Sequence, residues 1–323
     1  MSAVNSALVG DIGATNARFA IVAPDGTLTR SRVLLCEEYP GIAQAIAAYL
    51  ADANGTRPTH GVLAIAASPT GDMVAMTNHP WTFSIKELRA ELRMSELRVV
   101  NDFLATAAAV PYLEESERVQ IGGGTPAKDS PIGVIGPGTG LGVSTLVPGP
   151  HGPLPVPGEG GHVTMAAANE REAAVLAVMR GRYDHVSAER VLSGPGLVNL
   201  YNALRELSHV VAAPLTASQI TDPHTGEENA CAREATEMFC AMLGTVAGNL
   251  ALTLGARGGV YLAGGIVPKL GAAFGKSRFR ERFEAKGRFG TYLAQIPTYV
   301  IVRPLAALLG AAKLVARDHP KSG

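Results

Sequence analysis

The segment ALVGDIGATNARFAIV, residues 7–22, places a polar turn between two apolar runs. After the turn, Ala17–Val22 is rich in residues typical of strands, so no helix follows. The segment therefore predicts a β-hairpin with its tip at Asp11–Asn16. At such a tip Gly13 can adopt a positive φ and lets a phosphate approach the backbone, while Thr15 supplies a hydroxyl. An ordinary hairpin turn explains the same glycine, so this segment alone leaves both interpretations open.

The pattern occurs a second time in IGVIGPGTGLGVSTLV, residues 132–147, with its tip at Gly138–Gly140. Two such hairpins, one in each half of the chain, indicate a duplicated architecture with two phosphate-binding tips. Neither copy has the lysine of a GxxxxGK[ST] loop, and neither leads into the helix that a dinucleotide site requires. The sequence therefore argues against both of these nucleotide sites.

Length and composition set the frame for these motifs. The 323 residues exceed the size at which one core stops growing, which predicts two domains, and 47% apolar residues suffice to fill both. The 28 basic and 28 acidic residues balance to zero net charge, so neither nucleic acid nor a membrane surface is an expected partner. Three cysteines without a CxxC spacing predict a reducing compartment and no structural zinc.

The order of elements predicts alternating strands and helices. The first residues lack the pattern of a signal peptide. The apolar stretch Met238–Leu254 is predicted to be a core helix that ends at Gly255 and falls short of a bilayer span. Pro111 marks the expected domain boundary. Further helices are predicted at Gly41–Leu50, Ser84–Met94, Phe103–Val110, Glu170–Met179 and Ser187–Leu192, and strands at Gly61–Ala67 and Leu97–Val100.

Two segments carry side chains suited to acid–base chemistry and sugar binding. Asp102 lies where a strand ends and a helix begins, a place where ligand-facing residues of α/β sheets collect, and its carboxylate can act as a general base. An N-cap role explains Asp102 equally well. Glu159 and His162 occupy a glycine-rich bend, where they can accept and donate hydrogen bonds to sugar hydroxyls. A solvated loop histidine is the alternative for His162.

Two further segments have comparable dual interpretations. Ser187 is predicted to cap a helix with Glu189 in its first turn, where the helix dipole alone favours a carboxylate. Gly264 and Gly265 end a strand, and a flat adenine could lie against their bare backbone. A strand-to-helix turn explains these two glycines just as well.

Taken together, these residues resemble the bacterial glucokinases over nearly the whole chain. The resemblance is carried by the motifs LVGDIGATNAR, VAMTNHPW, NDF, GTGLGV, PGEGGH, HVSAERVLSGPGLVNLY, GGVYLAGGIVP and ALLGAAKL. It implies an α/β, two-domain hexokinase/actin-like (ribonuclease H-like) fold with mixed sheets and a deep interdomain cleft. Residues 1–111 would form a small α/β domain, completed by a C-terminal helix at 303–323, and residues 112–302 a large α/β domain.

The resemblance also implies an activity and a site. ATP with Mg²⁺ would phosphorylate the 6-hydroxyl of glucose, in a cytoplasmic homodimer that feeds glycolysis. Asp11 would orient the Mg²⁺ through water. By position, Asp102 matches the catalytic base; Asn101, Glu159, His162 and Glu189 match other glucose-binding positions; Gly10, Asp11, Ile12, Gly13, Ala14 and Thr15 match the ATP loop; Gly138, Thr139 and Gly140 would hold phosphate from the other domain; and Gly264 and Gly265 would border the adenosine.

The sequence departs from the family at Ala14, where a second glycine is common. The added methyl group restricts φ or narrows the loop, which puts nucleotide affinity in doubt rather than the reaction.

Three other functions compete with this one. A sugar-responsive repressor of the ROK group would carry a DNA-binding helix pair and a cysteine-rich zinc motif, and the sequence shows neither. A kinase of another hexose would differ in whether Glu159, His162 and Glu189 converge on a pyranose. An actin-like ATPase would hydrolyse ATP at full rate without sugar.

Overall fold

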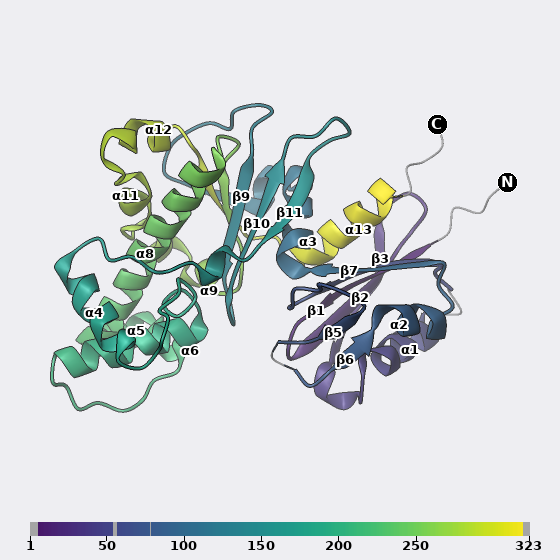
Figure 1. The fold of residues 1–323 in the computed structure, drawn as a ribbon, viewed down its shortest axis with the longest axis horizontal. Coiled ribbons are helices and arrows are strands. Elements are labelled where there is room, and N and C mark those ends of the chain that lie inside the picture. Colours follow the sequence, from purple (N-terminus) through teal and green to yellow (C-terminus); the bar gives the residue numbers. More distant parts are fainter. Residues whose placement is uncertain (1–5, 54–56, 78, 319–323) are drawn as a thin grey trace. The chain divides into compact units, whose positions relative to one another are not determined.

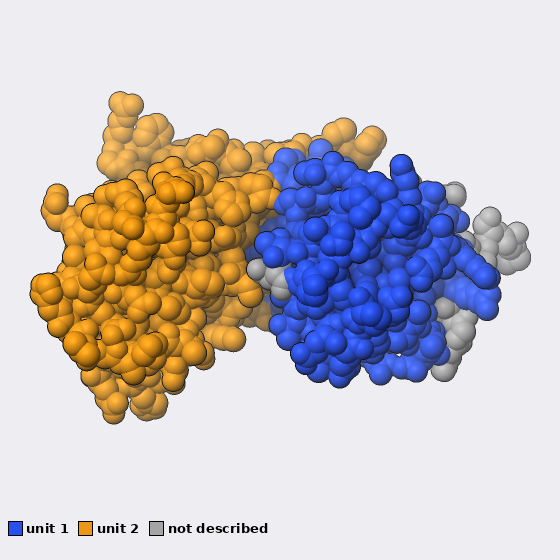
Figure 2. Space-filling view, turned by 60° about the horizontal axis from the view of Figure 1, so that its bottom comes forward, with its two compact units in different colours: residues 1–113, 153–157, 303–323 blue, residues 114–152, 158–302 orange. Residues whose placement is uncertain are grey.

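The computed structural model describes residues 6–53, 57–77 and 79–318, and the chain divides into two compact units. Unit 1 comprises residues 1–113, 153–157 and 303–323, and unit 2 comprises residues 114–152 and 158–302 (Figure 2). Asn78 of the VAMTNHPW motif and the end of the expected C-terminal helix, residues 319–323, lie outside the described residues.

The sheet of unit 1 has the strand order β3-β2-β1-β4-β7. Strands β1 and β2 form the predicted hairpin, and β4 and β7 continue the sheet in parallel to β1. The elements are β1 (Ala7–Ile12), β2 (Asn16–Val22), β3 (Leu28–Leu35), α1 (Ile42–Asp52), β4 (His60–Ile65), β5 (Met73–Ala75), β6 (Thr82–Ser84), α2 (Ile85–Glu91), β7 (Glu96–Asn101), α3 (Asp102–Ala109) and α13 (Ala306–Asp318).

Both faces of this sheet are buried, as the apolar run of β1 predicts. Leu8 and Ile12 contribute to a core with α1 and α2 on one face. Ala7 and Val9 point to the other face and join a core with α3 and α13. Helices α3 and α13 lie side by side over that face (Figure 1).

Gly310 permits the close contact between these two helices. A Cβ at this position would lie 1.7 Å from the carbonyl oxygen of Ala105 in α3. Only a residue without a side chain allows the two backbones to approach this closely. The position of α3, and with it that of Asp102, therefore depends on Gly310.

Unit 2 repeats the hairpin arrangement. Strands β9 and β10 pair antiparallel, β12 and β13 continue in parallel beyond β9, and β8 pairs antiparallel with β13. Each sheet contains an antiparallel hairpin whose first strand is followed by two parallel strands, in agreement with the predicted duplication. The elements of unit 2 are β8 (Arg118–Ile121), β9 (Ile132–Pro137), β10 (Leu141–Val147), α4 (Glu170–Arg180), α5 (Gly194–Leu207), α6 (Ala217–Ile220), α7 (Pro223–Glu228), α8 (Ala230–Leu254), β12 (Val260–Leu262), α9 (Ile266–Leu270), α10 (Ala272–Gly275), α11 (Phe279–Glu284), α12 (Gly290–Ala294) and β13 (Thr298–Ile301). Strand β11 (Leu154–Gly158) belongs to unit 1 except for its last residue.

The long helix α8 forms the centre of the unit 2 core (Figure 1). It ends at Gly255, whose φ of 59° is left-handed, as predicted. It begins at Ala230 rather than Met238, because Asn229 caps it through the Ala232 N–H. Among the described residues, this one helix is long and apolar enough to cross a membrane by length and composition. The prediction that the apolar stretch falls short of a bilayer span was therefore wrong. Because 67% of its most apolar window is buried within the structure, α8 has the character of a core helix.

The predicted helix at Ser187–Leu192 is wrong. This stretch consists of turns, and the helix begins at Gly194, where Ser193 accepts the Gly196 N–H and Pro195 occupies the first turn. Glu189 therefore lies on a turn that precedes α5, not in the first turn of a helix.

Candidate active site

The carboxyl edge of the unit 1 sheet brings two predicted groups together. Ile12 pairs with Ile65, and Ile65 pairs with Asn101, so three parallel strands end in register. The Ala66 N–H continues this pairing to the Ile12 carbonyl at 3.1 Å. Ligand-facing residues collect at the carboxyl ends of parallel strands. The first hairpin tip, Gly13–Thr15, and Asn101–Asp102 thus lie at one edge of one sheet.

The first tip closes through the Gly13 N–H, which donates to the Asn16 carbonyl at 2.9 Å. Gly13 is not among the positive-φ glycines, so the conformational reason predicted for it is wrong. The space predicted above it is present, because an added Cβ would meet only the Asn16 carbonyl, at 3.7 Å. Thr15 is exposed and Ala14 is half-buried.

Gly10 and Ile12 lie within β1, the strand that leads into the tip. A Cβ at Gly10 would come within 2.8 Å of the Leu63 side chain, and Ile12 is fully buried. Gly10 and Ile12 therefore pack within the core of unit 1.

Cys36 holds the first tip from the side of β3, a role that the sequence analysis missed. Its N–H donates to the Thr15 carbonyl at 2.9 Å, and its thiol donates to the Gly13 carbonyl at 3.5 Å. Burial raises the pKa of the Cys36 thiol, although nearby Arg18 opposes the shift. The thiol thus stays protonated at neutral pH and keeps its donor.

Asp11 lies in β1, one residue before the end of the strand that leads into this tip. Its side chain is 17% exposed and lies 3.5 Å from the Arg18 guanidinium, its neighbour across the hairpin. Burial raises the pKa of Asp11, and Arg18 offsets part of this effect. Such a desolvated carboxylate favours a nearby cation.

The described residues contain no group of three or more His, Cys, Asp or Glu side chains that could hold a metal. Mg²⁺ is commonly held by one or two carboxylates together with substrate phosphates and several waters. Asp11 suits that mode of binding, in which the ion arrives with a nucleotide.

Asn101 and Asp102 have distinct local roles. The Asn101 side chain caps α3: its Oδ1 accepts the Phe103 N–H at 2.9 Å and the Leu104 N–H at 3.2 Å. Its Nδ2 donates to the Ala67 carbonyl at 3.2 Å. Asp102 is the first residue of α3, and its Oδ1 accepts the Phe103 N–H at 2.9 Å. The alternative that Asp102 itself is the N-cap is therefore wrong.

The second tip, Gly138–Gly140, is closed in unit 2 by a Gly138 N–H that donates to the Gly140 carbonyl at 2.8 Å. The Gly194 N–H donates to the Gly138 carbonyl at 2.8 Å, which ties the start of α5 to this tip. Thr139 is exposed at the apex.

The bend with Glu159 and His162 packs against the base of this second tip. A Cβ at Gly161 would lie 2.1 Å from the Leu141 carbonyl oxygen, so the two backbones are in close contact. The His162 Nε2 lies 3.8 Å from a Glu159 carboxylate oxygen, and these side chains are 59% and 61% exposed. Both are thus accessible to a ligand.

Glu189 connects the bend with the second tip. Its Oε2 accepts the Leu141 N–H at 2.8 Å, and its own N–H donates to the Gly161 carbonyl at 2.8 Å. Unit 2 therefore gathers the second tip and three predicted sugar-binding residues in one place. The contact with Leu141 joins residues 48 apart, and no pattern in the sequence signals it.

The two glycines after β12 differ. Gly264 has a φ of 79°, and a Cβ there would lie 2.3 Å from the Pro137 carbonyl oxygen, so the strand-to-helix turn itself requires this glycine. Gly265 is exposed with open space around it, since an added Cβ would meet nothing within 4 Å.

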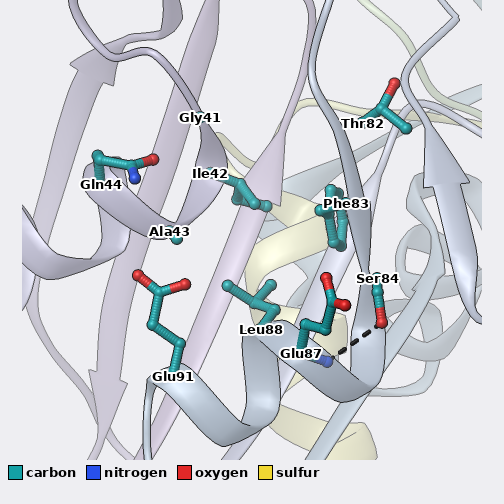
Figure 3. Close-up of a pocket in the computed structure, with 10 residues that line it drawn as sticks. All are labelled: Gly41, Ile42, Ala43, Gln44, Thr82, Phe83, Ser84, Glu87, Leu88 and Glu91. Carbon is teal, nitrogen blue, oxygen red and sulfur yellow. Dashed lines mark hydrogen bonds between the residues drawn. The ribbon is translucent and has the colours of Figure 1, made fainter.

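A pocket of about 180 Å³ lies elsewhere in unit 1, between the start of α1 and the β6–α2 junction (Figure 3). Ile42, Phe83 and Leu88 form its apolar part, while Glu87 and Glu91 add carboxylates. It contains none of the predicted site residues.

Comparison with known proteins identifies the family. The glucokinase family model matches residues 8–318. The glucokinase of Aromatoleum aromaticum is 52% identical over 318 residues, which cover 98% of this chain and 96% of that protein. The crystal structure of glucokinase from an Antarctic psychrotroph has a TM-score of 0.87 at 34% identity, with 97% of this chain and 99% of that chain covered.

A more distant structure, a ROK family glucokinase from Streptomyces griseus in complex with glucose and AMPPNP, shares the fold. Its TM-score is 0.63 at 17% identity, with 96% of this chain and 99% of that chain covered. These matches confirm the predicted α/β fold class, and the chain belongs to the glucokinase family of enzymes.

Proposed function

We propose that the chain transfers the γ-phosphoryl group of ATP to the 6-hydroxyl of D-glucose, with Asp102 as the general base. The observation that carries this proposal is the shared edge of the unit 1 sheet, where Asp102 begins α3 and Gly13–Thr15 follow β1. The name of the A. aromaticum relative and the ligands of the S. griseus structure support glucose and ATP as the substrates.

Asp102 acts on the acceptor of the phosphoryl group, which is the sugar hydroxyl. Its carboxylate takes the proton of the sugar hydroxyl as that oxygen attacks the phosphorus, a contribution typically worth about 10²- to 10⁴-fold in rate. The Phe103 N–H, bound to Oδ1, orients the carboxylate. The remaining sugar hydroxyls bind to Asn101, Glu159, His162 and Glu189, which together offer acceptors and donors.

The nucleotide side uses the two hairpin tips. Backbone N–H groups of the tips other than those of Gly13 and Gly138 bind the phosphates together with the exposed hydroxyls of Thr15 and Thr139. Gly264 and Gly265 border the adenosine. Phosphoryl transfer depends on positioning and charge stabilisation, and Mg²⁺ bound with ATP supplies part of that charge. Asp11 would hold this ion through water. Because water could attack the same phosphate, we expect efficient turnover only with sugar bound.

We further propose that the enzyme acts in the cytoplasm as a homodimer within glycolysis, as the family resemblance implies. Sedimentation of the purified chain at several concentrations tests the dimer. A species of 33.5 kDa at all concentrations would contradict it.

The experiment that tests the function is ADP release with glucose, mannose and fructose in turn, against a blank without sugar. The expected result is the highest kcat/KM with glucose, a product phosphorylated at the 6-hydroxyl by ³¹P NMR, and little ADP in the blank. A preference for another hexose would make this a different sugar kinase. An undiminished rate in the blank would contradict sugar-dependent transfer altogether.

A further inference from the structure

The Glu189 carboxylate occupies the space that Gly140 leaves open. An added Cβ at Gly140 would lie 2.5 Å from Glu189 Oε2, the same oxygen that accepts the Leu141 N–H at 2.8 Å. At Gly138, two residues earlier in the same tip, an added Cβ would meet nothing within 4 Å. The two glycines thus have different reasons to lack a side chain.

The backbone around Glu189 fixes this arrangement. The Glu189 N–H donates to the Gly161 carbonyl at 2.8 Å, and the Glu189 carbonyl accepts the Ser193 hydroxyl at 2.8 Å. With its main chain held at both groups, Glu189 can respond to a change at the tip only by moving its side chain. A Cβ at Gly140 meets the end of that side chain and must displace it.

We infer that Gly140 is a positioning residue for sugar binding: it leaves room for the Glu189 carboxylate, which links the second phosphate tip to the sugar. This inference rests on the proposed function for the sugar role of Glu189. In this arrangement Oε2 stays on the Leu141 N–H while Oε1 accepts a sugar hydroxyl. A displacement of either the tip or the carboxylate then affects both ligands, and the coupling is reciprocal.

The test compares alanine substitutions at three glycines. Gly140→Ala should weaken glucose binding about tenfold in the absence of nucleotide, the effect of one displaced charge-assisted hydrogen bond, measured by calorimetry. Gly138→Ala changes the same tip without contacting Glu189, so its effect should fall on nucleotide and leave the glucose Kd within about twofold. Gly123→Ala, also with nothing within 4 Å of its Cβ, controls for the substitution itself.

Hydrogen exchange at the Leu141 amide gives a readout that does not require sugar. Gly140→Ala and Glu189→Ala should both accelerate this exchange, whereas Glu189→Gln retains an acceptor oxygen and should preserve its protection. Unchanged exchange in Gly140→Ala would overturn the contact, and faster exchange with an unchanged glucose Kd would overturn the link to sugar.

The two failures are distinguishable. If the unmodified chain binds no glucose, the proposed function and the sugar link both fail. The Leu141 exchange then still reports whether Gly140 positions the Glu189 carboxylate.

Discussion

The contact between α3 and α13 offers a quantitative test of how the fold positions Asp102. In Gly310→Ala the new Cβ would lie 1.7 Å from the Ala105 carbonyl oxygen and 3.1 Å from the Ala109 nitrogen. Because both of these atoms belong to backbone, no side chain can rotate away. An ordinary contact begins at 3.4 Å, so the Cβ and the Ala105 oxygen must separate by roughly 1.7 Å.

Two opposing effects set the stability change. Overpacking costs typically about 1–3 kcal/mol, and alanine gains about 0.5–1 kcal/mol over glycine within a helix. The separation of the backbones dominates, so we expect a net loss of about 1–2 kcal/mol in urea unfolding. Because α3 begins at Asp102, kcat should fall as well, and a displacement of about 1 Å can cost on the order of 10²-fold.

Gly226→Ala in α7 is the matched control. Its added Cβ would lie 3.7 Å from the Arg233 side chain, an ordinary contact, so only the helix gain of about 0.5–1 kcal/mol is expected. If Gly310→Ala is stabilised like Gly226→Ala and keeps full kcat, the close approach of the two helices is not what positions Asp102.

Three further predictions concern stability and nucleotide binding. Burial opposes ionisation of Glu172, but hydrogen bonds from Arg282 and the Ala168 N–H outweigh it and hold its pKa below the ordinary 4.5. The contribution of ionised Glu172 to the free energy of unfolding is therefore complete above pH 4.5 and is lost as pH falls below that value. Arg282→Met should cost about 3–5 kcal/mol at neutral pH, measured by urea unfolding, and should make the free energy of unfolding less dependent on pH below 4.5. Gly264→Ala should lower the melting temperature, because an alanine at a φ of 79° is strained and its Cβ would collide with the Pro137 carbonyl oxygen. Gly265→Ala should leave the melting temperature unchanged and raise the KM for ATP. Equal melting temperatures for the two variants would refute this distinction. Asn101→Ala removes the cap of α3 and should cost about 0.5–2 kcal/mol in urea unfolding. A loss below about 0.3 kcal/mol, roughly the error of such a measurement, would contradict the capping role.

The hairpins and the parallel strands were predictable because their signals are local. Alternating and apolar runs around Gly13 and Gly138 define strands, and the repeat in two halves indicates the duplication. The end of α8 was also predictable, since Gly255 is a typical C-terminal signal. Its start was not, because Arg233, Glu234 and Glu237 interrupt the apolar run although they belong to the first turns of the same helix.

The parts that sequence reasoning missed depend on contacts between distant segments. The turn at Glu189 resembles a helix start, yet its conformation is set by hydrogen bonds to Leu141 and Gly161. Cys36 was considered only for its redox chemistry, whereas its contact with the first tip follows from the pairing of β2 with β3. Such contacts require the register of the sheet, which the residue pattern does not contain.

The most direct test of the central claim is the kcat of Asp102→Asn, together with its glucose Kd. Asparagine keeps an Oδ1 that can accept the Phe103 N–H, so the start of α3 should be preserved while the proton acceptor is lost. We predict a kcat reduced by about 10²- to 10⁴-fold with a glucose Kd within a few fold of the unmodified enzyme. A variant that keeps most of its kcat would remove Asp102 from the mechanism and contradict the account.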